Sequence, residues 1–235
     1  MGELYLYSKD RLPGGTSSSF VVRPYDPITT SKFSMYSAFF PVPLYNVDSR
    51  NNVLDFNDGV VKSVTITPGA YSIGSLVAAI ETGLNNASTN FTVTFDSTTL
   101  FVTIARSAGT VNLLFGTGTN VASSIASTIG FAEADTGVGP SFTGGYAPDL
   151  VTPATILVQI QEPGFAGVTT AGLRYTFSVP ITSDIPGTIF YEPVEPECIT
   201  LEAPRAFHQF TVALFDDQSR PLNLHGAEWN MRLRY

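Results

Sequence analysis

Ile66-Thr67-Pro68-Gly69-Ala70-Tyr71-Ser72 leads into the most regular stretch of the sequence. Beyond this point, apolar side chains recur at i, i+3, i+4, i+7 and i+11, which is the spacing of one face of an α-helix. The residues on this face are Ile73, Leu76, Val77, Ile80 and Leu84. Pro68-Gly69 favours a turn, and Ser72 is typical of an N-cap, because its hydroxyl can accept from a backbone N–H that lacks an intrahelical partner. The sequence therefore predicts a helix from Ser72 to Leu84.

Two strands are expected after this helix, over Phe91–Phe95 and Leu100–Ile104. Side chains alternate in character with period two in both runs, as in strands that bury one face. The polar connection Asp96-Ser97-Thr98-Thr99 joins them, so we expect an antiparallel hairpin. A short third strand is expected over Val111–Phe115.

A second, shorter helix is expected where Val121, Ile125 and Ile129 lie four residues apart. Gly130 follows at the position of a left-handed C-cap. Two helices on a small sheet form a compact α+β unit, which we assign to residues 64–131. The region from Ala132 to Pro153 is rich in glycine and proline and reads as a long connection.

Short strands separated by turn residues are expected in the rest of the chain, at the spacing of an antiparallel sandwich. Residues 1–17 read as an N-terminal arm that is ordered only if something holds it. The prolines of Glu192-Pro193-Val194-Glu195-Pro196-Glu197 indicate an exposed connection or a sheet edge. The expected strands are 18–23, 31–40, 45–47, 51–54, 60–67, 156–161, 173–181, 188–191, 207–215 and 229–235. A jelly roll has about eight such strands.

Composition limits the classes of partner. Of the 235 residues, 43% are hydrophobic and 14% are charged, so the surface is poor in charge and suggests burial against partners. The net charge is −8 and the basic residues are scattered singly along the sequence, which speaks against direct nucleic-acid binding. Cys198 is the only cysteine, so an internal disulfide is excluded. No membrane span and no signal peptide are expected.

Candidate chemistry is sparse. His208 reads as a hydrogen-bonded strand residue and His225 as a surface loop residue, and neither has the spacing of a metal ligand pair. Hard oxygen ligands for calcium could come from Asp184, Glu192, Glu195, Glu197 and Glu202, but these residues lack the dense loop of a compact site. The run from Leu113 to Thr119 matches a phosphate loop only weakly. We therefore predict no enzyme activity, no catalytic residues, no cofactor and no metal site.

Several short motifs resemble penton-type minor capsid proteins of virophages, Polinton-like elements and large eukaryotic DNA viruses, in the adenovirus-like capsid lineage. The motifs are Tyr45-Asn46-Val47 with Asn51-Asn52, Ile66-Thr67-Pro68-Gly69-Ala70-Tyr71-Ser72, Phe91-Thr92-Val93-Thr94-Phe95-Asp96, Ser127-Thr128-Ile129-Gly130-Phe131 and Leu222-Asn223-Leu224-His225-Gly226-Ala227-Glu228-Trp229. They cover residues from about Ser31 to Phe131 and the last twenty or so. No motif of this kind lies between Ala132 and Glu202.

The resemblance implies a mainly β fold: a single jelly-roll β-sandwich over residues 18–63 and 132–235, with the α+β unit inserted. It also implies a homopentamer at the fivefold vertices of an icosahedral capsid, with neighbouring major capsid protein capsomers as partners and the virion as location. A hexon-type protein needs two jelly rolls, and at this length only one fits beside the insertion. A host receptor is a further partner that the insertion could contact.

Two alternatives remain open. One is a receptor- or carbohydrate-binding β-sandwich, for which an exposed Trp or Tyr platform is expected. Trp229 lies within an alternating strand, which favours the core. The other is a different single jelly-roll capsid protein of the shell. The interface residues do not follow from the sequence.

Overall fold

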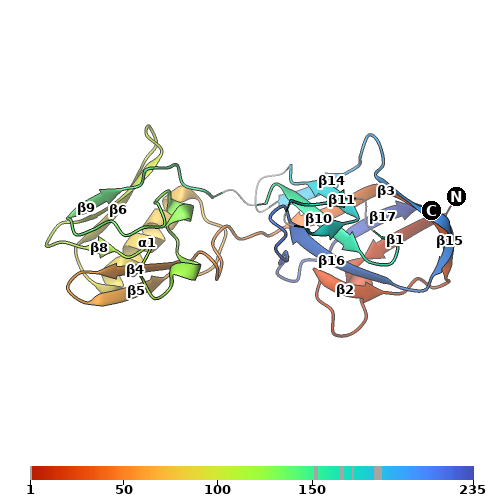
Figure 1. Ribbon diagram of the computed structural model, residues 1–235, viewed down its shortest axis with the longest axis horizontal. Coiled ribbons are helices and arrows are strands. Elements are labelled where there is room, and N and C mark those ends of the chain that lie inside the picture. The colour runs from red at the N-terminus through yellow and green to blue at the C-terminus, as the bar shows by residue number, and fades with distance from the viewer. Residues whose placement is uncertain (1, 151–152, 165–166, 171, 183–186) are drawn as a thin grey trace. The chain divides into compact units, whose positions relative to one another are not determined.

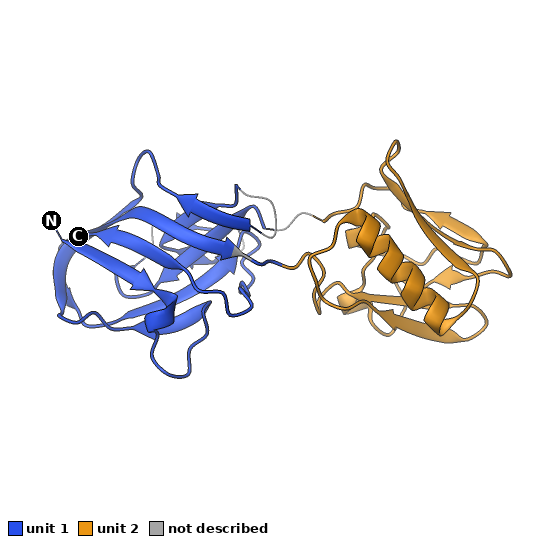
Figure 2. Cartoon of the chain, turned by 180° about the vertical axis from the view of Figure 1, so that it is seen from behind, with its two compact units in different colours: residues 1–44, 153–235 blue, residues 45–152 orange. Residues whose placement is uncertain are grey.

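The computed structural model describes residues 2–150, 153–164, 167–170, 172–182 and 187–235. The chain divides into two compact units (Figure 2). Unit 1 comprises Met1–Leu44 and Pro153–Tyr235, and unit 2 is the segment Tyr45–Thr152 that lies between them in the sequence. Each unit has its own hydrophobic core, so each is described by itself.

Unit 1 is a sandwich of two antiparallel sheets (Figure 1). Its elements are β1 (Glu3–Tyr7), η1 (Ser8–Asp10), β2 (Ser19–Val22), β3 (Ile28–Val42), β10 (Thr155–Ile160), β11 (Gly167–Val168), β12 (Arg174–Tyr175), β13 (Phe177–Pro180), β14 (Gly187–Tyr191), β15 (Cys198–Phe207), β16 (Phe210–Asp216) and β17 (Asn230–Arg234). One sheet of the sandwich has the order β1-β17-β3-β14, with β15 also paired to β3, and the other has the order β13-β10-β16-β2, while β11 and β12 form a separate two-stranded sheet.

The strand pairing of unit 1 is nested. The first strand pairs with the last (β1 with β17), the second with the last but one (β2 with β16), the third with β14 and β15, and β10 with β13. Nested antiparallel pairing over two packed sheets is the arrangement of a jelly roll. Unit 2 is inserted between β3 and β10. The predicted fold class, a mainly β single jelly roll with an inserted small α+β unit, is confirmed.

Aromatic side chains fill the space between the two sheets of unit 1. The Trp229 ring stacks on Phe40 at a centroid distance of 4.5 Å, and its indole Nε1 donates to the Ser17 carbonyl at 2.7 Å. Phe33 packs edge-on against Phe207 and Phe210. Trp229 is only 2% exposed, which confirms its predicted place in the core. With its polar N–H satisfied, the indole stabilises the core through burial of its full apolar area.

Unit 2 contains the helix that the sequence predicted. Its elements are β4 (Val53–Asn57), β5 (Val61–Thr65), α1 (Ile73–Ala87), β6 (Phe91–Asp96), β7 (Phe101–Arg106), β8 (Asn112–Leu113), η2 (Val121–Ser123), η3 (Ser127–Ile129) and β9 (Ser141–Thr143). Ser72 is the N-cap of α1, and its Oγ accepts from the Ser75 N–H at 3.2 Å. The helix buries Leu76, Ile80 and Leu84, as the apolar spacing requires. No helix in the described part of the chain is long and apolar enough to span a membrane.

Helix α1 approaches the strand β5 closely. A Cβ added at Gly83 would lie 2.4 Å from Cγ1 of Val64, so only glycine fits at this contact. The predicted hairpin is confirmed as β6 paired with β7, with Phe91 opposite Arg106. The third strand is also confirmed, although β8 is shorter than expected and pairs with β4.

The predicted second helix is wrong. Two 3₁₀ turns, η2 and η3, lie there instead, separated by Ser124 in an extended conformation. The Ile125 N–H donates to the Val53 carbonyl at 2.8 Å rather than to its own turn, so the backbone is recruited to β4 and a continuous helix cannot form. Gly130 does have the predicted left-handed conformation, with φ 79°, and the Tyr146 carbonyl passes where its Cβ would be.

The boundaries of the inserted unit lie outside the expected residues 64–131. Residues 18–63, which contain β4 and the start of β5, were expected in the sandwich, but β4 pairs with β5 on one side and with β8 of unit 2 on the other. At the other end, β9 pairs with β7, so residues 132–152 are not a mere connection. Unit 2 consequently runs from Tyr45 to Thr152. The sequence missed this because the β4–β8 and β7–β9 pairings join distant segments.

The expected N-terminal arm, residues 1–17, contains a strand of the sandwich. β1 pairs with β17, and Gly2 and Tyr235 exchange two backbone hydrogen bonds of 2.8 and 3.0 Å. Leu6 is 1% exposed, which explains the apolar alternation of the segment. The sequence also missed β15, which follows the proline-rich connection and shifts register along β3 between Thr200 and Arg205.

Candidate interaction surface

The outward face of the sheet β1-β17-β3-β14 collects aromatic and arginine side chains. Register fixes which residues share this face, because neighbours across the ladder point to the same side. Tyr7, Asn230, Phe39 and Phe190 form one row across all four strands. Tyr5 and Arg232 form part of the next row, and Glu3 and Arg234 part of the row after it.

Several aromatic rings on this face are open to solvent. Phe190 is 69% exposed, Tyr5 46% and Phe39 39%. Tyr5 and Tyr7 stack with ring centroids 6.0 Å apart and planes 12° apart. The solvent-facing side of an antiparallel sheet normally carries small polar or charged side chains, so this composition is typical of a surface that another molecule covers.

Cations bridge the rings. The Arg234 guanidinium lies 3.6 Å from the centroid of Tyr36, and Arg232 lies 4.5 Å from Tyr36 and 5.5 Å from Tyr5. The Lys9 ammonium lies 4.9 Å from the Tyr7 ring. These contacts hold the long cationic side chains in one orientation, which lowers the entropy lost when a partner binds.

Glu3 is the anion among these cations. Its carboxylate accepts from Arg232 Nη2 at 2.5 Å and from Arg234 Nε at 3.4 Å. The hydrogen bond from Arg232 lowers the pKa of Glu3 below its ordinary value, and the same bond raises the pKa of Arg232. The ionised Glu3 on β1 therefore adds side-chain ion pairs with Arg232 and Arg234 on β17 to the backbone pairing of the two strands.

We call this surface the aromatic–arginine face. It consists of Glu3, Tyr5, Tyr7, Lys9, Lys32, Tyr36, Phe39, Phe190, Arg232 and Arg234. The basic residues looked scattered in the sequence, whereas the fold gathers four of the twelve here. The period-two alternation in Glu3-Leu4-Tyr5-Leu6-Tyr7 was the available signal, and pairing of β1 with β17 was the missing information.

The two histidines lie outside this face. His208 was expected on a strand, but it is exposed in the short turn between β15 and β16. His225 is exposed in a turn, as predicted, and has a left-handed backbone with φ 49°. The structure brings neither of them to a second histidine, cysteine or carboxylate that would complete a metal site within the described residues.

The acidic residues weighed as calcium ligands are not gathered into a site among the described residues. Glu197 instead bonds to Ser178, accepting from its backbone N–H at 3.0 Å and from its hydroxyl at 2.6 Å. Glu192, Glu195 and Glu202 are exposed. Asp184 lies outside the described residues.

The run from Leu113 to Thr119, the weak match to a phosphate loop, binds the carboxylate of Asp135 from the same chain. The Asp135 carboxylate accepts from the backbone N–H groups of Gly116 and Thr117 at 2.8 and 3.0 Å. The Thr117 hydroxyl donates to the same carboxylate at 2.5 Å, and these hydrogen bonds lower the pKa of Asp135. A phosphate would have to displace this side chain, so the loop is a structural turn.

A buried carboxylate organises the inner part of unit 2. Asp55 is 4% exposed and accepts from Ser63 Oγ at 2.6 Å and from the Asn120 N–H at 2.7 Å. Burial alone would raise the pKa of Asp55, but the hydrogen bonds from Ser63 and Asn120 outweigh it and leave the pKa below its ordinary value. The ionised carboxylate thus ties β4 and β5 to the turn before η2.

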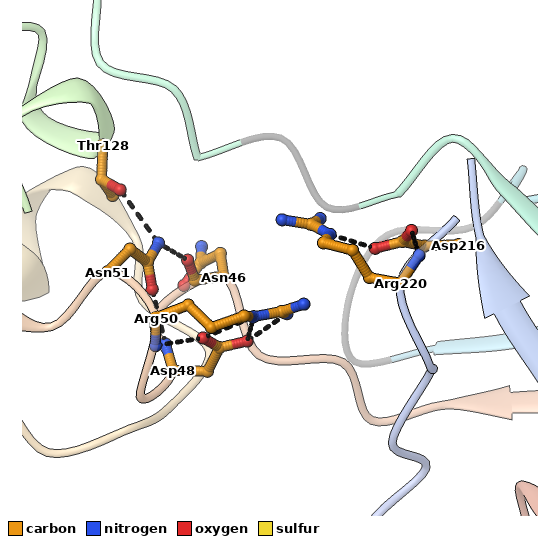
Figure 3. A network of polar contacts seen from close by, with 7 residues as sticks. All are labelled: Asn46, Asp48, Arg50, Asn51, Thr128, Asp216 and Arg220. Carbon is orange, nitrogen blue, oxygen red and sulfur yellow. Dashed lines mark hydrogen bonds and ion pairs between the residues drawn. The ribbon is translucent and has the colours of Figure 1, made fainter. Parts of the chain in front are cut away.

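Each unit has a polar network of its own (Figure 3). In unit 2, Asn51 Nδ2 donates to the Asn46 carbonyl and to Thr128 Oγ1, both at 2.9 Å, and the Asp48 carboxylate pairs with Arg50. In unit 1, Asp216 accepts from Arg220 Nε at 2.6 Å. The motif residues Asn46, Asn51 and Thr128 therefore have a structural role that shapes the start of unit 2.

A pocket of 380 Å³ lies along the free edge of β1. Its lining includes Tyr5, Arg23, Tyr25 and the carboxylates of Asp10 and Asp26. Neither histidine nor Cys198 takes part in its lining. The pocket therefore offers hydrogen-bonding groups and an exposed tyrosine, but no paired nucleophile and base.

Comparison with known proteins finds similarity at the level of structure. No protein-family model matches the sequence, and no curated protein sequence matches it significantly. Among solved structures, the chain is similar to the crystal structure of the selenomethionine-labelled mavirus penton protein, at a TM-score of 0.49 and 10% sequence identity. The match covers 99% of this chain and 98% of that chain.

Proposed function

We propose that the chain is a structural capsid protein, the vertex (penton) subunit of a DNA virus, which assembles as a homopentamer at icosahedral fivefold positions. The observation that carries this proposal is a jelly-roll sandwich whose outward sheet face bears exposed aromatic and arginine side chains. Double-sheet jelly rolls recur in viral capsids, lectins and cupins, so the fold alone leaves the class open. Tyr, Phe and Arg enrichment favours a protein interface.

The number of jelly rolls supports a vertex role within the capsid. Unit 1 forms one jelly roll, and unit 2 is an α+β insertion rather than a second one. The short motifs of the sequence that resemble penton-type capsid proteins lie mainly in unit 2 and directly before β17. A ring of subunits also accounts for a chain with 14% charged residues, because the sides of each subunit are buried.

Several partners follow from this proposal. Neighbouring copies close the ring, and major capsid protein capsomers surround it in the shell of the virion. Exposed residues of unit 2, such as Val60, Leu100 and Val138, are available for contact with a host receptor. Catalysis, a cofactor and direct nucleic-acid binding form no part of the proposed function.

Size-exclusion chromatography with light scattering, followed by negative-stain imaging, tests the proposal on the full chain. We expect a mass of five subunits and rings with fivefold symmetry. Assembly in the presence of a major capsid protein is the second arm, because a vertex subunit can need its neighbours to assemble. A chain that stays monomeric in both arms contradicts the proposal.

The carbohydrate-binding alternative receives less support. Trp229, the only tryptophan of the sequence, is buried and stacked on Phe40, so it cannot form an exposed platform for a sugar. The exposed Tyr5 is covered in part by Arg232, and the half-buried Tyr7 by Lys9. A different single jelly-roll position in the shell would give another ring size, which the same light-scattering measurement separates from a pentamer.

A further inference from the structure

The aromatic–arginine face has a charge opposite to that of the chain as a whole. The chain carries a net charge of −8. The cations on the face are Lys9, Lys32, Arg232 and Arg234, and the carboxylate of Glu3 lies between two of them. The acidic excess therefore lies elsewhere on the molecule, so the chain contains both members of a complementary pair of surfaces.

An acidic surface lies beyond the opposite edge of the same sheet. It is the acidic proline segment, Glu192-Pro193-Val194-Glu195-Pro196-Glu197, which joins β14 to β15. Glu192 and Glu195 are exposed, and within the described residues neither has an ion-pair partner. Val194 is 101% exposed, so an apolar side chain projects between the two carboxylates.

Sheet order separates the charges of β1 and β17 from the acidic proline segment. Glu3, Arg232 and Arg234 lie on β1 and β17, on one side of β3, whereas the acidic proline segment joins β14 to β15 on the other side, next to Phe190. A contact between the cationic surface of one copy and the acidic surface of the next is therefore heterologous, since each copy uses two different patches. Repetition of such a contact produces a ring when the rotation closes.

We propose that the aromatic–arginine face binds the acidic proline segment of a neighbouring copy of this chain. This inference rests on the proposed homopentamer and assigns its subunit contact. Glu192 and Glu195 pair with the cations of the face, and Val194 packs against the exposed rings. The prolines keep the segment extended before binding, so little conformational entropy is lost when it docks.

A second copy suits this face better than nucleic acid does. Arginine and tyrosine on a sheet can also stack on the bases of a single strand. The chain as a whole repels a polyanion, however, because the four cations are a minority among 20 acidic residues. An extended carboxylate segment on the same chain supplies the complementary charge without this long-range repulsion.

Charge reversal on each side tests the contact in the full chain. Lys9→Glu with Arg234→Glu reverses two charges of the face and spares Arg232, which has the shorter bond to Glu3. Glu192→Lys with Glu195→Lys reverses the acidic proline segment. Each double variant is expected to raise the subunit concentration at half assembly by about tenfold or more in near-physiological salt. Arg174→Glu, an exposed reversal on β12 outside both surfaces, is the control and is expected to assemble as the wild type does.

Combining all four substitutions in one chain is the decisive variant. It restores opposite charges across every contact of a ring, so assembly is expected to recover toward the wild-type concentration. Sedimentation velocity measures the assembly, and far-ultraviolet circular dichroism checks that each variant is folded. Fluorescence anisotropy with a labelled single-stranded oligonucleotide measures binding of the competing ligand.

The outcomes separate the inference from the proposed function. A wild-type pentamer that neither reversal weakens, or one that both weaken and the combined variant does not restore, overturns the interface alone. A wild-type chain that does not assemble, with or without a major capsid protein, overturns the pentamer and the interface together. Oligonucleotide binding that is lost with Lys9→Glu and Arg234→Glu, while assembly persists, assigns the face to nucleic acid and also overturns the inference.

Discussion

Units 1 and 2 differ in how far apart in the sequence their paired strands lie. In unit 1 the nested pairing joins β1 to β17 and β2 to β16, across nearly the whole chain. In unit 2 the hairpins β4–β5 and β6–β7 join neighbours, and α1 packs on the strands that flank it in the sequence, β5 and β6. Unit 2 can therefore gain contacts at low loop-closure cost, whereas unit 1 needs both ends of the chain.

The comparison predicts that the units fold independently. Replacing Tyr45–Thr152 with a short Gly/Ser linker should leave a jelly roll that unfolds cooperatively, because its core has no member from unit 2. Trp229 fluorescence reports the unfolding of unit 1, since this is the only tryptophan of the sequence. Deleting Phe207–Phe215 instead removes most of the central strand β16 and should abolish the transition. Loss of the cooperative unfolding transition in both deletion variants would show that the jelly roll needs unit 2 to fold.

Matched core substitutions should destabilise one unit at a time. Phe33 and Phe56 are both fully buried and both make edge-on aromatic contacts, Phe33 in unit 1 and Phe56 in unit 2. Replacing either with alanine should cost about 3–5 kcal/mol in the free energy of unfolding of its own unit. Urea titration followed by Trp229 fluorescence for unit 1, and by amide hydrogen exchange in α1 for unit 2, measures the two separately. Loss in both signals from one substitution would contradict independence.

The Asp55 carboxylate should give unit 2 a pH dependence that unit 1 does not share. Its pKa is lowered in the folded state, so its stabilisation is present above the unfolded pKa of about 3.9 and is lost as pH falls through the folded pKa. Asp55→Asn should destabilise unit 2 by about 1–3 kcal/mol at pH 7. The difference in the free energy of unfolding between Asp55→Asn and the wild type should become smaller below about pH 4, because Asp55 of the wild type then begins to be protonated. Amide hydrogen exchange in α1 at pH 7 and below about pH 4 measures the free energy of unfolding of unit 2 in both proteins. A difference between them that does not change with pH would contradict a role for the ionised Asp55 carboxylate.

Two glycines of α1 should respond oppositely to alanine. At Gly74 a Cβ meets nothing within 4 Å, so Gly74→Ala should stabilise unit 2 by about 0.5–1 kcal/mol through helix propensity. At Gly83 the same change places a Cβ against Val64, and overpacking of about 1–3 kcal/mol should exceed the propensity gain. Thermal unfolding followed by helical circular dichroism compares the two variants, and stabilisation by Gly83→Ala would show that the contact with β5 is loose.

The sequence predicted best what is determined locally. Ser72 and the apolar face of α1 were found because a cap and a helical period need no distant partner. The alternation of Phe91–Phe95 gave the hairpin for the same reason. The 3₁₀ turns near Ile125 were missed because Val53, far away in the sequence, takes the backbone bond that a helix would use.

The interaction surface was beyond the reach of the sequence. Arg232, Arg234 and Tyr5 lie at opposite ends of the chain, and only the pairing of β1 with β17 brings them together. Two prolines hid β15 in the same way, because proline is rare inside strands: Pro196 precedes β15, and β15 tolerates Pro204 at its register shift. The predicted fold class was nevertheless correct, because it depends on the number and spacing of the strands and not on which strands pair.

The reciprocal bonds between Gly2 and Tyr235 set an order of events during synthesis. At roughly 5–20 residues per second, unit 2 leaves the ribosome complete while β16 and β17 are still to be made. The edge of β3 that pairs with β17 then stays unpaired until β17 has been synthesised. Closure of the sandwich therefore follows the synthesis of β17, and a nascent chain halted before Asn230 should present a finished insertion on an unfinished jelly roll.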